Sequence, residues 1–597
     1  MKLIEPPLAE PHERWCERSE IPQSEEFPPT RLAEMRSVMY NGCKRNGEMT
    51  MKKNDAFLTT CENYTYEGLG VVRVDGFPLF VKGLLAGERA WVAVTKLKKT
   101  YGYARIVEVL DASLQRRQPS CPLAARCGGC QLQHMSYEEQ LRFKRQKVQD
   151  VIDRIAQLPL EVRPVRGMEI PYFYRNKAQI PFRMEKGELH SGFYRINSND
   201  IIDMEVCAIQ SHAINAVYAD VCRLLKERPA LWEGLRHVLI KHAFEGKELM
   251  VVFISRPSGP SAWKELATEL MRLHPQITSV LLNINDRSDN VILGEEEILL
   301  AGRAYIEDQM EGLSFHISAK SFYQVNPPQT RVLYQTALEA CGLSGTETVL
   351  DLYCGVGTIS LFLARHAKKV VGIEIVEPAI RNAKENARRN GISNVEFICS
   401  DAAAYARTVV QEGIHPDVIC VDPPRKGCAK SVLEDIVRMA PERIVYVSCD
   451  PGTLARDLRI LEDLGYETKW VQPVDMFPQT HSVETVVLLS HKKPDSVINV
   501  KVEFGEGEGK VPLDNIAKRA EAYKPKERVT YKMIKEYIEA KYGFKVHTAY
   551  IAEVKRDLGL PMYDAPNVVE ELKQPRKHPT AEKVEAIKDA LKYFGII

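Results

Sequence analysis

Between about residues 346 and 490, short runs of strand-forming residues alternate with helical patterns. This alternation constrains the predicted fold more than any other feature of the sequence. A helical pattern at 378–390 has Pro378 at its first position and Gly391 just past its end, where helices favour these residues. Strands that alternate with helices in this way predict a doubly wound α/β domain. The runs that read as strands are TVLDLY, KVVGIEI, VEFICSD, DVICVD, RIVYVSC and TVVLLS.

The length and composition indicate a multidomain protein of ordinary soluble type. A chain of 597 residues is too long for one core, so we expect three or four domains. Its net charge is only +1, so any nucleic-acid surface must be a local patch. No apolar run approaches the ~20 residues that span a bilayer, and the N-terminus lacks the apolar region of a secretory signal. We therefore expect a cytoplasmic protein without membrane contact, and nothing points to an obligate protein partner.

The rest of the chain divides by pattern into four further segments. Residues 1–54 are rich in Pro, Glu and Arg without lasting periodicity, which predicts disorder or a start codon assigned too far upstream. Residues 55–116 show short β-branched or aromatic runs between glycine turns, typical of a small OB-like barrel. Residues 117–320 mix strands and helices and predict an α+β domain. Residues 321–495 hold the α/β domain, and 496–597 combine a linker with three helical patterns, a module that contacts RNA or is purely structural.

Two basic segments stand out. In the barrel, cations interleave with aromatics, which suits phosphate contact with base stacking but equally a solvated edge strand. A helix is predicted from Ser136 to about Gln157, with acidic residues in its first turn and a basic outer face. The barrel residues are Lys96, Lys98, Lys99, Tyr101, Tyr103 and Arg105, and the helical ones are Arg142, Lys144, Arg145 and Lys147.

The segment VLDLYCGVGTISLFLA has the pattern of a nucleotide site: a strand, a glycine turn and a helix. Gly355 and Gly357 let the backbone approach a ligand, but the third glycine of a dinucleotide fingerprint is missing. Glu374 ends the next strand, where an acid accepts hydrogen bonds from ribose hydroxyls. Asp401 ends the strand after that, placed to touch an adenine edge. This combination favours S-adenosylmethionine over a dinucleotide.

Three further residues are expected at the same sheet edge. Asp422 follows a strand in VDPPRKG, whose Arg425 and Lys426 could hold phosphates, and Cys449 follows the next strand in SCDPGTLARD. A thiolate beside a methyl donor suggests C5 methylation of a pyrimidine, because addition at C6 makes C5 nucleophilic. A base must then remove the C5 proton, and Glu484, before the last strand, is the candidate.

Five motifs occur in an order that closely resembles the RNA uracil-5 methyltransferases (RumA/TrmA class). They are SFYQVNPPQT, DLYCGVGTISL, VDPPRKG, SCDPGTLARDL and HSVETVVLL, and the resemblance extends from about residue 55 to 495. It implies a TRAM domain near 58–115, Cys449 as nucleophile and Glu484 as proton acceptor. It also implies that S-adenosylmethionine or its surroundings are contacted by Gln324, Tyr353, Glu374 and Asp422.

The remaining cysteines suggest a metal group. Cys121, Cys127 and Cys130 are close in sequence, and Cys207 follows 77 residues after Cys130. Four thiolates suit zinc or an iron–sulfur cluster, and spacing alone does not choose between them. The resemblance implies a [4Fe-4S] cluster, because the rRNA branch of the family carries one together with a TRAM domain. We predict core or incidental roles for Cys354, Cys399, Cys420 and Cys428.

The favoured function is therefore methylation of uracil C5 in 23S rRNA through a covalent Cys449 adduct. A tRNA-specific enzyme is the nearest alternative. Amino-group methylation is another, because VDPP is similar to the N/D-P-P-Y turn of such enzymes. A non-catalytic, RNA-binding iron–sulfur protein is the alternative from a different class.

Overall fold

The computed structural model describes residues 44–45, 48–49, 51–492 except 258 and 288, 531–558, 560, 578–594 and 596. It divides into two units, Met1–Lys493 and Pro494–Ile597. The expectations for residues 1–43 and for the linker at 504–510 lie outside the described residues. Among the helices of the described ranges, none is long and apolar enough to cross a membrane.

The first unit begins with a strand pair, β1 (Lys44–Arg45) and β2 (Glu48–Met49), and the expected barrel. Its six strands follow the order β3-β7-β8-β6-β5-β4 around a small apolar core. On its surface Phe80, Tyr101 and Tyr103 pack against one another, with centroids 5.3–5.9 Å apart. The strands are β3 (Ala56–Thr60), β4 (Asn63–Tyr64), β5 (Gly70–Val74), β6 (Phe77–Val81), β7 (Arg89–Leu97) and β8 (Gly102–Asp111).

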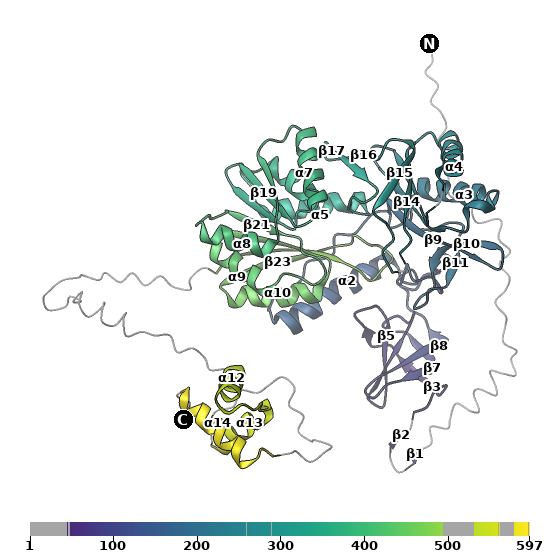
Figure 1. The fold of residues 1–597 in the computed structure, drawn as a ribbon. Coiled ribbons are helices and arrows are strands. Elements are labelled where there is room, and N and C mark those ends of the chain that lie inside the picture. The colour runs from purple at the N-terminus through teal and green to yellow at the C-terminus, as the bar shows by residue number, and fades with distance from the viewer. Residues whose placement is uncertain are drawn as a thin grey trace. The chain divides into compact units, whose positions relative to one another are not determined.

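The central domain is a mixed sheet with two helices, as the α+β prediction required. Its strand order is β11-β10-β9-β12-β13-β14-β15, and α3 and α4 lie beside it (Figure 1). Apolar side chains of both helices are buried in the same core as those of the sheet. A 3₁₀ turn (Pro229–Leu231) and a hairpin of β16 and β17 complete it. The bounds are β9 (Lys177–Glu185), β10 (Glu188–Tyr194), β11 (Ile201–Asp203), α3 (His212–Lys226), β12 (Leu235–His242), β13 (Leu249–Ser255), α4 (Pro260–Leu273), β14 (Ile277–Ile284), β15 (Glu296–Gly302), β16 (Tyr305–Met310) and β17 (Leu313–Ser318).

The α/β domain has the predicted doubly wound sheet, in the order β20-β19-β18-β21-β22-β24-β23. Only β24 runs against its neighbours. Apolar cores lie on both faces, because central strands such as β21 are buried throughout. The elements are α5 (Pro327–Cys341), β18 (Thr348–Leu352), α6 (Thr358–Ala364), β19 (Lys369–Glu374), α7 (Glu377–Arg389), β20 (Val395–Cys399), α8 (Ala402–Gln411), β21 (Val418–Val421), α9 (Lys430–Met439), β22 (Arg443–Ser448), α10 (Pro451–Asp463), β23 (Tyr466–Val474) and β24 (Glu484–His491).

Helix α2 (Tyr137–Val151) corrects one sequence-based expectation. It starts where predicted, with the Ser136 side chain accepting a hydrogen bond from the backbone of Glu139, and continues into a π-helical turn (Ile152–Ala156). Its basic residues do not all face outward, because Lys144 is fully buried and Lys147 is only 6% exposed. The buried ammonium groups are stabilised by acceptors on residues 475–481, as burial of charge requires. Lys144 Nζ lies 2.5 Å from Asp475 Oδ1, and Lys147 Nζ donates to the His481 carbonyl at 2.8 Å.

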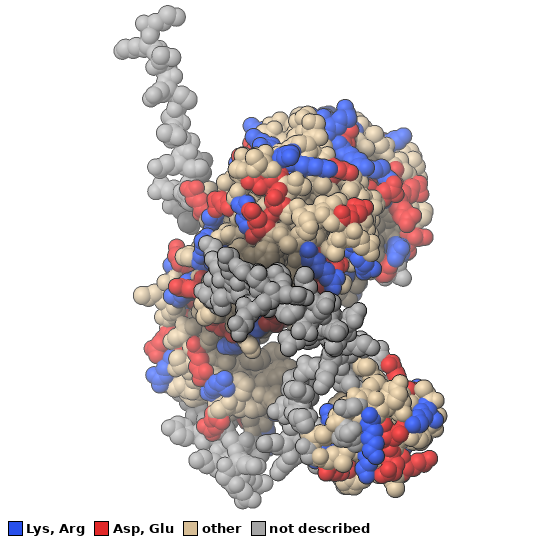
Figure 2. Space-filling model, turned by 90° about the vertical axis from the view of Figure 1, so that its left-hand side faces the viewer, with Lys and Arg blue, Asp and Glu red and all other residues tan. Residues whose placement is uncertain are grey.

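The second unit contains the three predicted helices, α12 (Tyr531–Tyr542), α13 (Thr548–Asp557) and α14 (Ala581–Tyr593). They bury one apolar cluster between them, which explains why each short helix is stable. The His547 side chain caps α13 by accepting a hydrogen bond from the Ala549 backbone amide. Figure 2 shows Lys and Arg side chains interspersed with Asp and Glu on the visible face, in keeping with the near-zero net charge.

Candidate active site

A cleft of about 1110 Å³ opens at the carboxyl ends of the parallel strands in the α/β domain. The sheet grows outward from β18 in both directions, through β19 on one side and β21 on the other. The strand order therefore reverses beside β18, and open α/β sheets bind ligands at such a switch point. Seven predicted residues of the α/β site line this one cleft, although each comes from a different connection. They are Gln324, Tyr353, Glu374, Asp401, Asp422, Cys449 and Glu484.

The turn after β18 needs glycine at two positions for different reasons. Gly355 and Gly357 have φ angles of +57° and +78°, a region that favours glycine. A Cβ on Gly357 would lie 2.5 Å from the Phe397 ring, whereas one on Gly355 would meet open space. Only Gly355 therefore presents unobstructed backbone to the cleft, and Gly357 is required by the packing beneath the turn.

Two acidic residues are held by backbone amides. Glu374 accepts from the Gly355 amide at 3.2 Å and from the Val376 amide at 3.0 Å, so the acid at the end of β19 is tied to the glycine turn. Asp401 caps α8 through the amides of Ala403 and Ala404. Both carboxylates remain at the cleft wall, where they can accept hydrogen bonds from a nucleoside.

Gln324 enters the cleft from the connection between β17 and α5. Lys241 stabilises this connection from the central domain: its ammonium group donates to the Ser318 and Ser321 carbonyls at 2.7 and 2.9 Å. The Asn176 amide donates to the Gln324 carbonyl at 2.9 Å. The central domain therefore helps to position one wall of the cleft.

Cys449 lies between β22 and α10, half-buried at the cleft wall and outside the apolar core. Burial raises the pKa of the Cys449 thiol to about 11, and the charges of Glu484 and Asp422 act in the same direction. The Arg425 guanidinium opposes them. These interactions place the thiol among two carboxyl groups and one cation at the cleft wall, a polar setting that a core cysteine would lack.

Glu484 is the first residue of β24 and is only 5% exposed. Burial raises its pKa to about 8, with a smaller contribution from Asp422, while Arg425 acts in the opposite direction. Burial alone raises the pKa of Asp422 to about 7. A carboxyl group with a pKa near neutrality can accept and release a proton under physiological conditions.

Sequence reasoning missed one buried acid beneath the cleft. Asp351, in the DLYCG segment, is fully buried and accepts a hydrogen bond from the Ser360 hydroxyl. Burial raises its pKa to about 7, and the Ser360 hydrogen bond opposes the shift. The available signal was an acid near the end of a largely apolar strand, shortly before the glycine turn.

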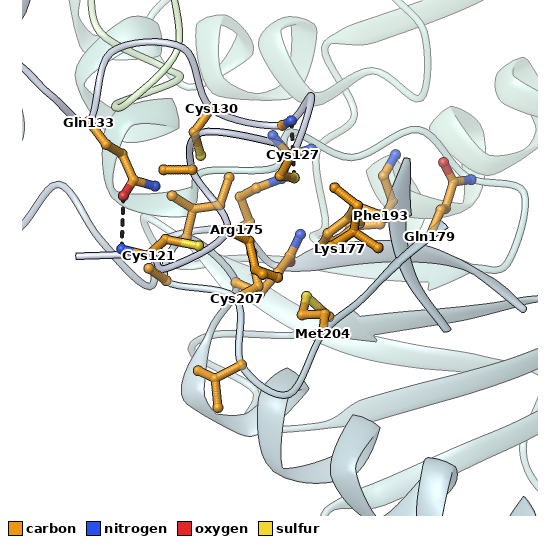
Figure 3. Close-up of a pocket in the computed structure, with 18 residues that line it drawn as sticks. Cys121, Cys127, Cys130, Gln133, Arg175, Lys177, Gln179, Phe193, Met204 and Cys207 are labelled. Atoms are coloured by element: carbon orange, nitrogen blue, oxygen red, sulfur yellow. Dashed lines mark hydrogen bonds between the residues drawn. The ribbon is translucent and has the colours of Figure 1, made fainter. Parts of the chain in front are cut away.

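A second cavity, of about 320 Å³, lies in the central domain and is lined by Cys121, Cys127, Cys130 and Cys207 (Figure 3). Two cations, Arg175 and Lys177, line it as well. Within the described ranges, no group of three or more His, Cys, Asp or Glu side chains is arranged to hold a metal ion. The four cysteines thus share one cavity without forming a compact site for a single ion.

Comparison with known proteins identifies the family that the sequence motifs resemble. The model of the tRNA (uracil-5-)-methyltransferase family matches residues 136–492, and the TRAM domain matches residues 60–107. A protein of Halalkalibacterium halodurans named an uncharacterized RNA methyltransferase is 48% identical over 450 residues, which are 74% of this chain and 98% of the relative. A similarly named protein of Clostridium tetani is 43% identical over 455 residues, again 74% of this chain and 98% of the relative.

A solved structure shares the architecture. It is the Pyrococcus abyssi tRNA (uracil-54, C5)-methyltransferase in complex with S-adenosyl-L-homocysteine, with a TM-score of 0.58 and 25% identity. The match covers 72% of this chain and 100% of that one. The family match, the TRAM domain and the shared fold confirm the resemblance found in the motifs. The chain belongs to the tRNA (uracil-5-)-methyltransferase family and is an S-adenosylmethionine-dependent RNA methyltransferase.

Proposed function

We propose that the enzyme transfers a methyl group from S-adenosylmethionine to C5 of a uracil in 23S rRNA, through a covalent adduct with Cys449. The observation that carries this proposal is the presence of Cys449 and Glu484 on the wall of one cleft. Amino-group methylation needs no thiol, and a non-catalytic binding protein needs no buried carboxyl group beside a thiol. An RNA substrate also favours a cytoplasmic location.

The proposed chemistry assigns one step to each residue. The Cys449 thiolate forms a bond to C6 of the uracil, and the electron pair of the C5–C6 double bond moves into the enolate. C5 then takes the methyl group, whose bond to the donor's sulfur breaks. Glu484 accepts the C5 proton, the double bond forms again, and the Cys449 sulfur leaves C6. The enzyme is returned to its starting state once Glu484 releases the proton.

The donor would bind along the wall formed by β18 and β19. Glu374 is suited to the ribose hydroxyls, because its carboxylate is fixed by two backbone amides and faces the cleft. Asp401 is suited to the adenine edge, and the exposed side chains of Ile375 and Val376 offer apolar surface for the ring. Gln324, Tyr353 and Asp422 would contact the rest of the donor or the reacting base.

We further propose that the cysteine cavity holds a [4Fe-4S] cluster. Its four thiols surround a cavity too spacious for one ion, and Arg175 and Lys177 can offset the negative charge of a thiolate-ligated cluster. Backbone amides are directed at the sulfurs: the Gly129 amide donates to Cys127 Sγ at 3.4 Å. Such a group would join the segment of Cys121, Cys127 and Cys130 to the distant Cys207, and methyl transfer requires no redox step from it.

Purified anaerobically, the protein should be brown and absorb at the edge of the visible range. Replacing Cys127 and Cys130 with serine should abolish the colour and lower the iron content, because two of four ligands are lost. The matched control is Cys222→Ser, since Cys222 is half-buried in the same domain but outside the cavity. A colourless protein that contains zinc instead of iron would contradict the cluster.

The choice of 23S rRNA rests on the combination of a TRAM domain with the four cysteines. The Pyrococcus abyssi enzyme acts on tRNA, as its name states, so tRNA is the second substrate to test. The decisive experiment maps 5-methyluridine in 23S rRNA and tRNA from cells with and without the gene. We expect a uridine in 23S rRNA to lose its methyl group in the deletion strain, while a loss confined to tRNA would favour the alternative.

A further inference from the structure

Tyr66 belongs to the barrel, in the loop between β4 and β5, yet it reaches the turn that carries Cys449. Burial raises the pKa of Tyr66 to about 12, the Asp450 carboxylate acts in the same direction, and the Gly452 amide opposes them. Asp450 caps α10, and Gly452 lies in its first turn, directly after Cys449. The phenol group therefore extends from one domain to the active-site turn of another.

Arg425 links Tyr66 to the cleft. Burial raises the pKa of both Tyr66 and Cys449, and the Arg425 guanidinium group lowers both. Cys449 also contributes directly to the shift of Tyr66. Since electrostatic interactions weaken with distance, the barrel tyrosine and the candidate nucleophile belong to the same charged neighbourhood.

The Tyr66 ring is contacted by a buried lysine and remains partly exposed. Lys147 Nζ lies 3.8 Å from the ring centroid and is itself fixed by its hydrogen bond to the His481 carbonyl. A cation in this position orients an aromatic ring. Tyr66 nevertheless remains 42% exposed, although its neighbour Lys147 is buried. This arrangement presents an oriented aromatic surface to whatever enters beside Cys449.

The barrel loop is anchored firmly enough for such a role. Two residues before Tyr66, the Tyr64 hydroxyl donates to Glu139 on α2 at 2.7 Å and accepts from the Ala86 amide at 3.0 Å. The Tyr64 ring also packs edge-on against Phe143 of α2, with centroids 5.6 Å apart. Helix α2 thus holds both the barrel loop and, through Lys147, the segment that leads to Glu484.

We propose that Tyr66 is an RNA-contacting residue of the active site, whose exposed ring stacks on a nucleotide next to the target uracil. This inference rests on the proposed function. A uracil inside a stack must be extruded before a thiol can reach C6, and its neighbour then loses a stacking partner. An aromatic side chain replaces that partner without regard to base identity. The barrel would therefore complete the active site as well as bind RNA at a distance from it.

The test combines Tyr66→Ala with RNA oligonucleotides that carry an abasic site at each position flanking the target. On intact RNA, Tyr66→Ala should lower kcat/KM about tenfold, in the range found when a stacking aromatic is removed. Wild-type enzyme should lose a similar factor when the stacked nucleotide is abasic. At that position the two losses should not multiply, because both remove the same contact. Tyr66→Phe should retain near wild-type activity on all substrates.

Tyr542→Ala is the matched control, since Tyr542 is 39% exposed and also lies near a lysine, Lys541, but belongs to the other unit. On each abasic RNA, Tyr542→Ala should lose the same factor in kcat/KM as the wild type. Losses that multiply at every flanking position, or an unaffected Tyr66→Ala, would overturn the inference while leaving the function intact. If the wild type forms no 5-methyluridine on any RNA, the proposed function fails and the inference fails with it.

Discussion

Cys449→Ala is expected to abolish methyl transfer, with a loss of at least about 10³-fold in kcat, while RNA and donor binding remain at wild-type level. The reason is that uracil C5 is inert until a nucleophile adds to C6, and no other cysteine in the described residues lines the cleft except Cys354, which is buried. The measurement is incorporation of labelled methyl groups into RNA, with filter binding to follow RNA affinity.

Cys222→Ala provides the control for this variant, because Cys222 is also half-buried but lies on α3 in the central domain. It should turn over normally. RNA with 5-fluorouridine at the target position adds a direct readout, since fluorine cannot leave C5 as a cation and the adduct persists. Wild-type enzyme should form this stable complex and Cys449→Ala should not. Retained turnover in Cys449→Ala would favour the amino-group alternative.

The thiol environment also predicts how the reaction begins. A thiol with a pKa of about 11 is mostly protonated at neutral pH, so the ligand-free enzyme is poorly nucleophilic. The two carboxyl groups that raise this pKa would be offset by a nearby positive charge. A cationic sulfonium ligand in the same cleft supplies one, which favours activation of Cys449 only after the donor has bound.

The α/β fold and the convergence of the candidate residues on one cleft were largely predictable, because their signals are local. Glycine turns and polar residues at strand ends lie within a few residues of the strands they follow, as in the segments around Gly355 and Cys449. The topology then brings these ends to one edge whatever the intervening helices contain. Asp351 was missed because an acid inside an apolar strand gives no sign of whether it points to solvent or to a buried serine.

Long-range partners were not predictable from the same signals. The helical pattern of α2 suggested solvent exposure for Lys144 and Lys147. It gave no sign of their acceptors, because these lie more than 300 residues later in the chain. The position of Tyr66 beside Cys449 depends on how the barrel packs against α2, and no local pattern encodes that. A lone tyrosine in a loop has the same sequence signature whether it faces solvent or an active site.

A matched pair of variants isolates the role of Glu484. Glu484→Gln keeps the size and shape of the side chain but replaces a carboxyl group that can accept a proton with an amide that cannot. Glu467→Gln is the control, because Glu467 lies on the adjacent strand β23 and is exposed to solvent. It should turn over like the wild type, which would show that loss of an exposed carboxylate from the neighbouring strand is tolerated.

Glu484→Gln itself is expected to trap the methylated uracil on Cys449, because the C5 proton cannot be removed and the sulfur cannot leave. The complex should survive denaturation and appear as a band of reduced mobility in a denaturing gel. In the wild type, decay of the intermediate should accelerate as the pH rises through about 8, since burial holds the Glu484 pKa there and only the deprotonated form accepts a proton. By this step the donor's positive charge has been consumed, so it no longer lowers that pKa. Normal turnover of Glu484→Gln would exclude Glu484 as the base and leave Asp422, the other carboxyl group beside the thiol, as the proton acceptor.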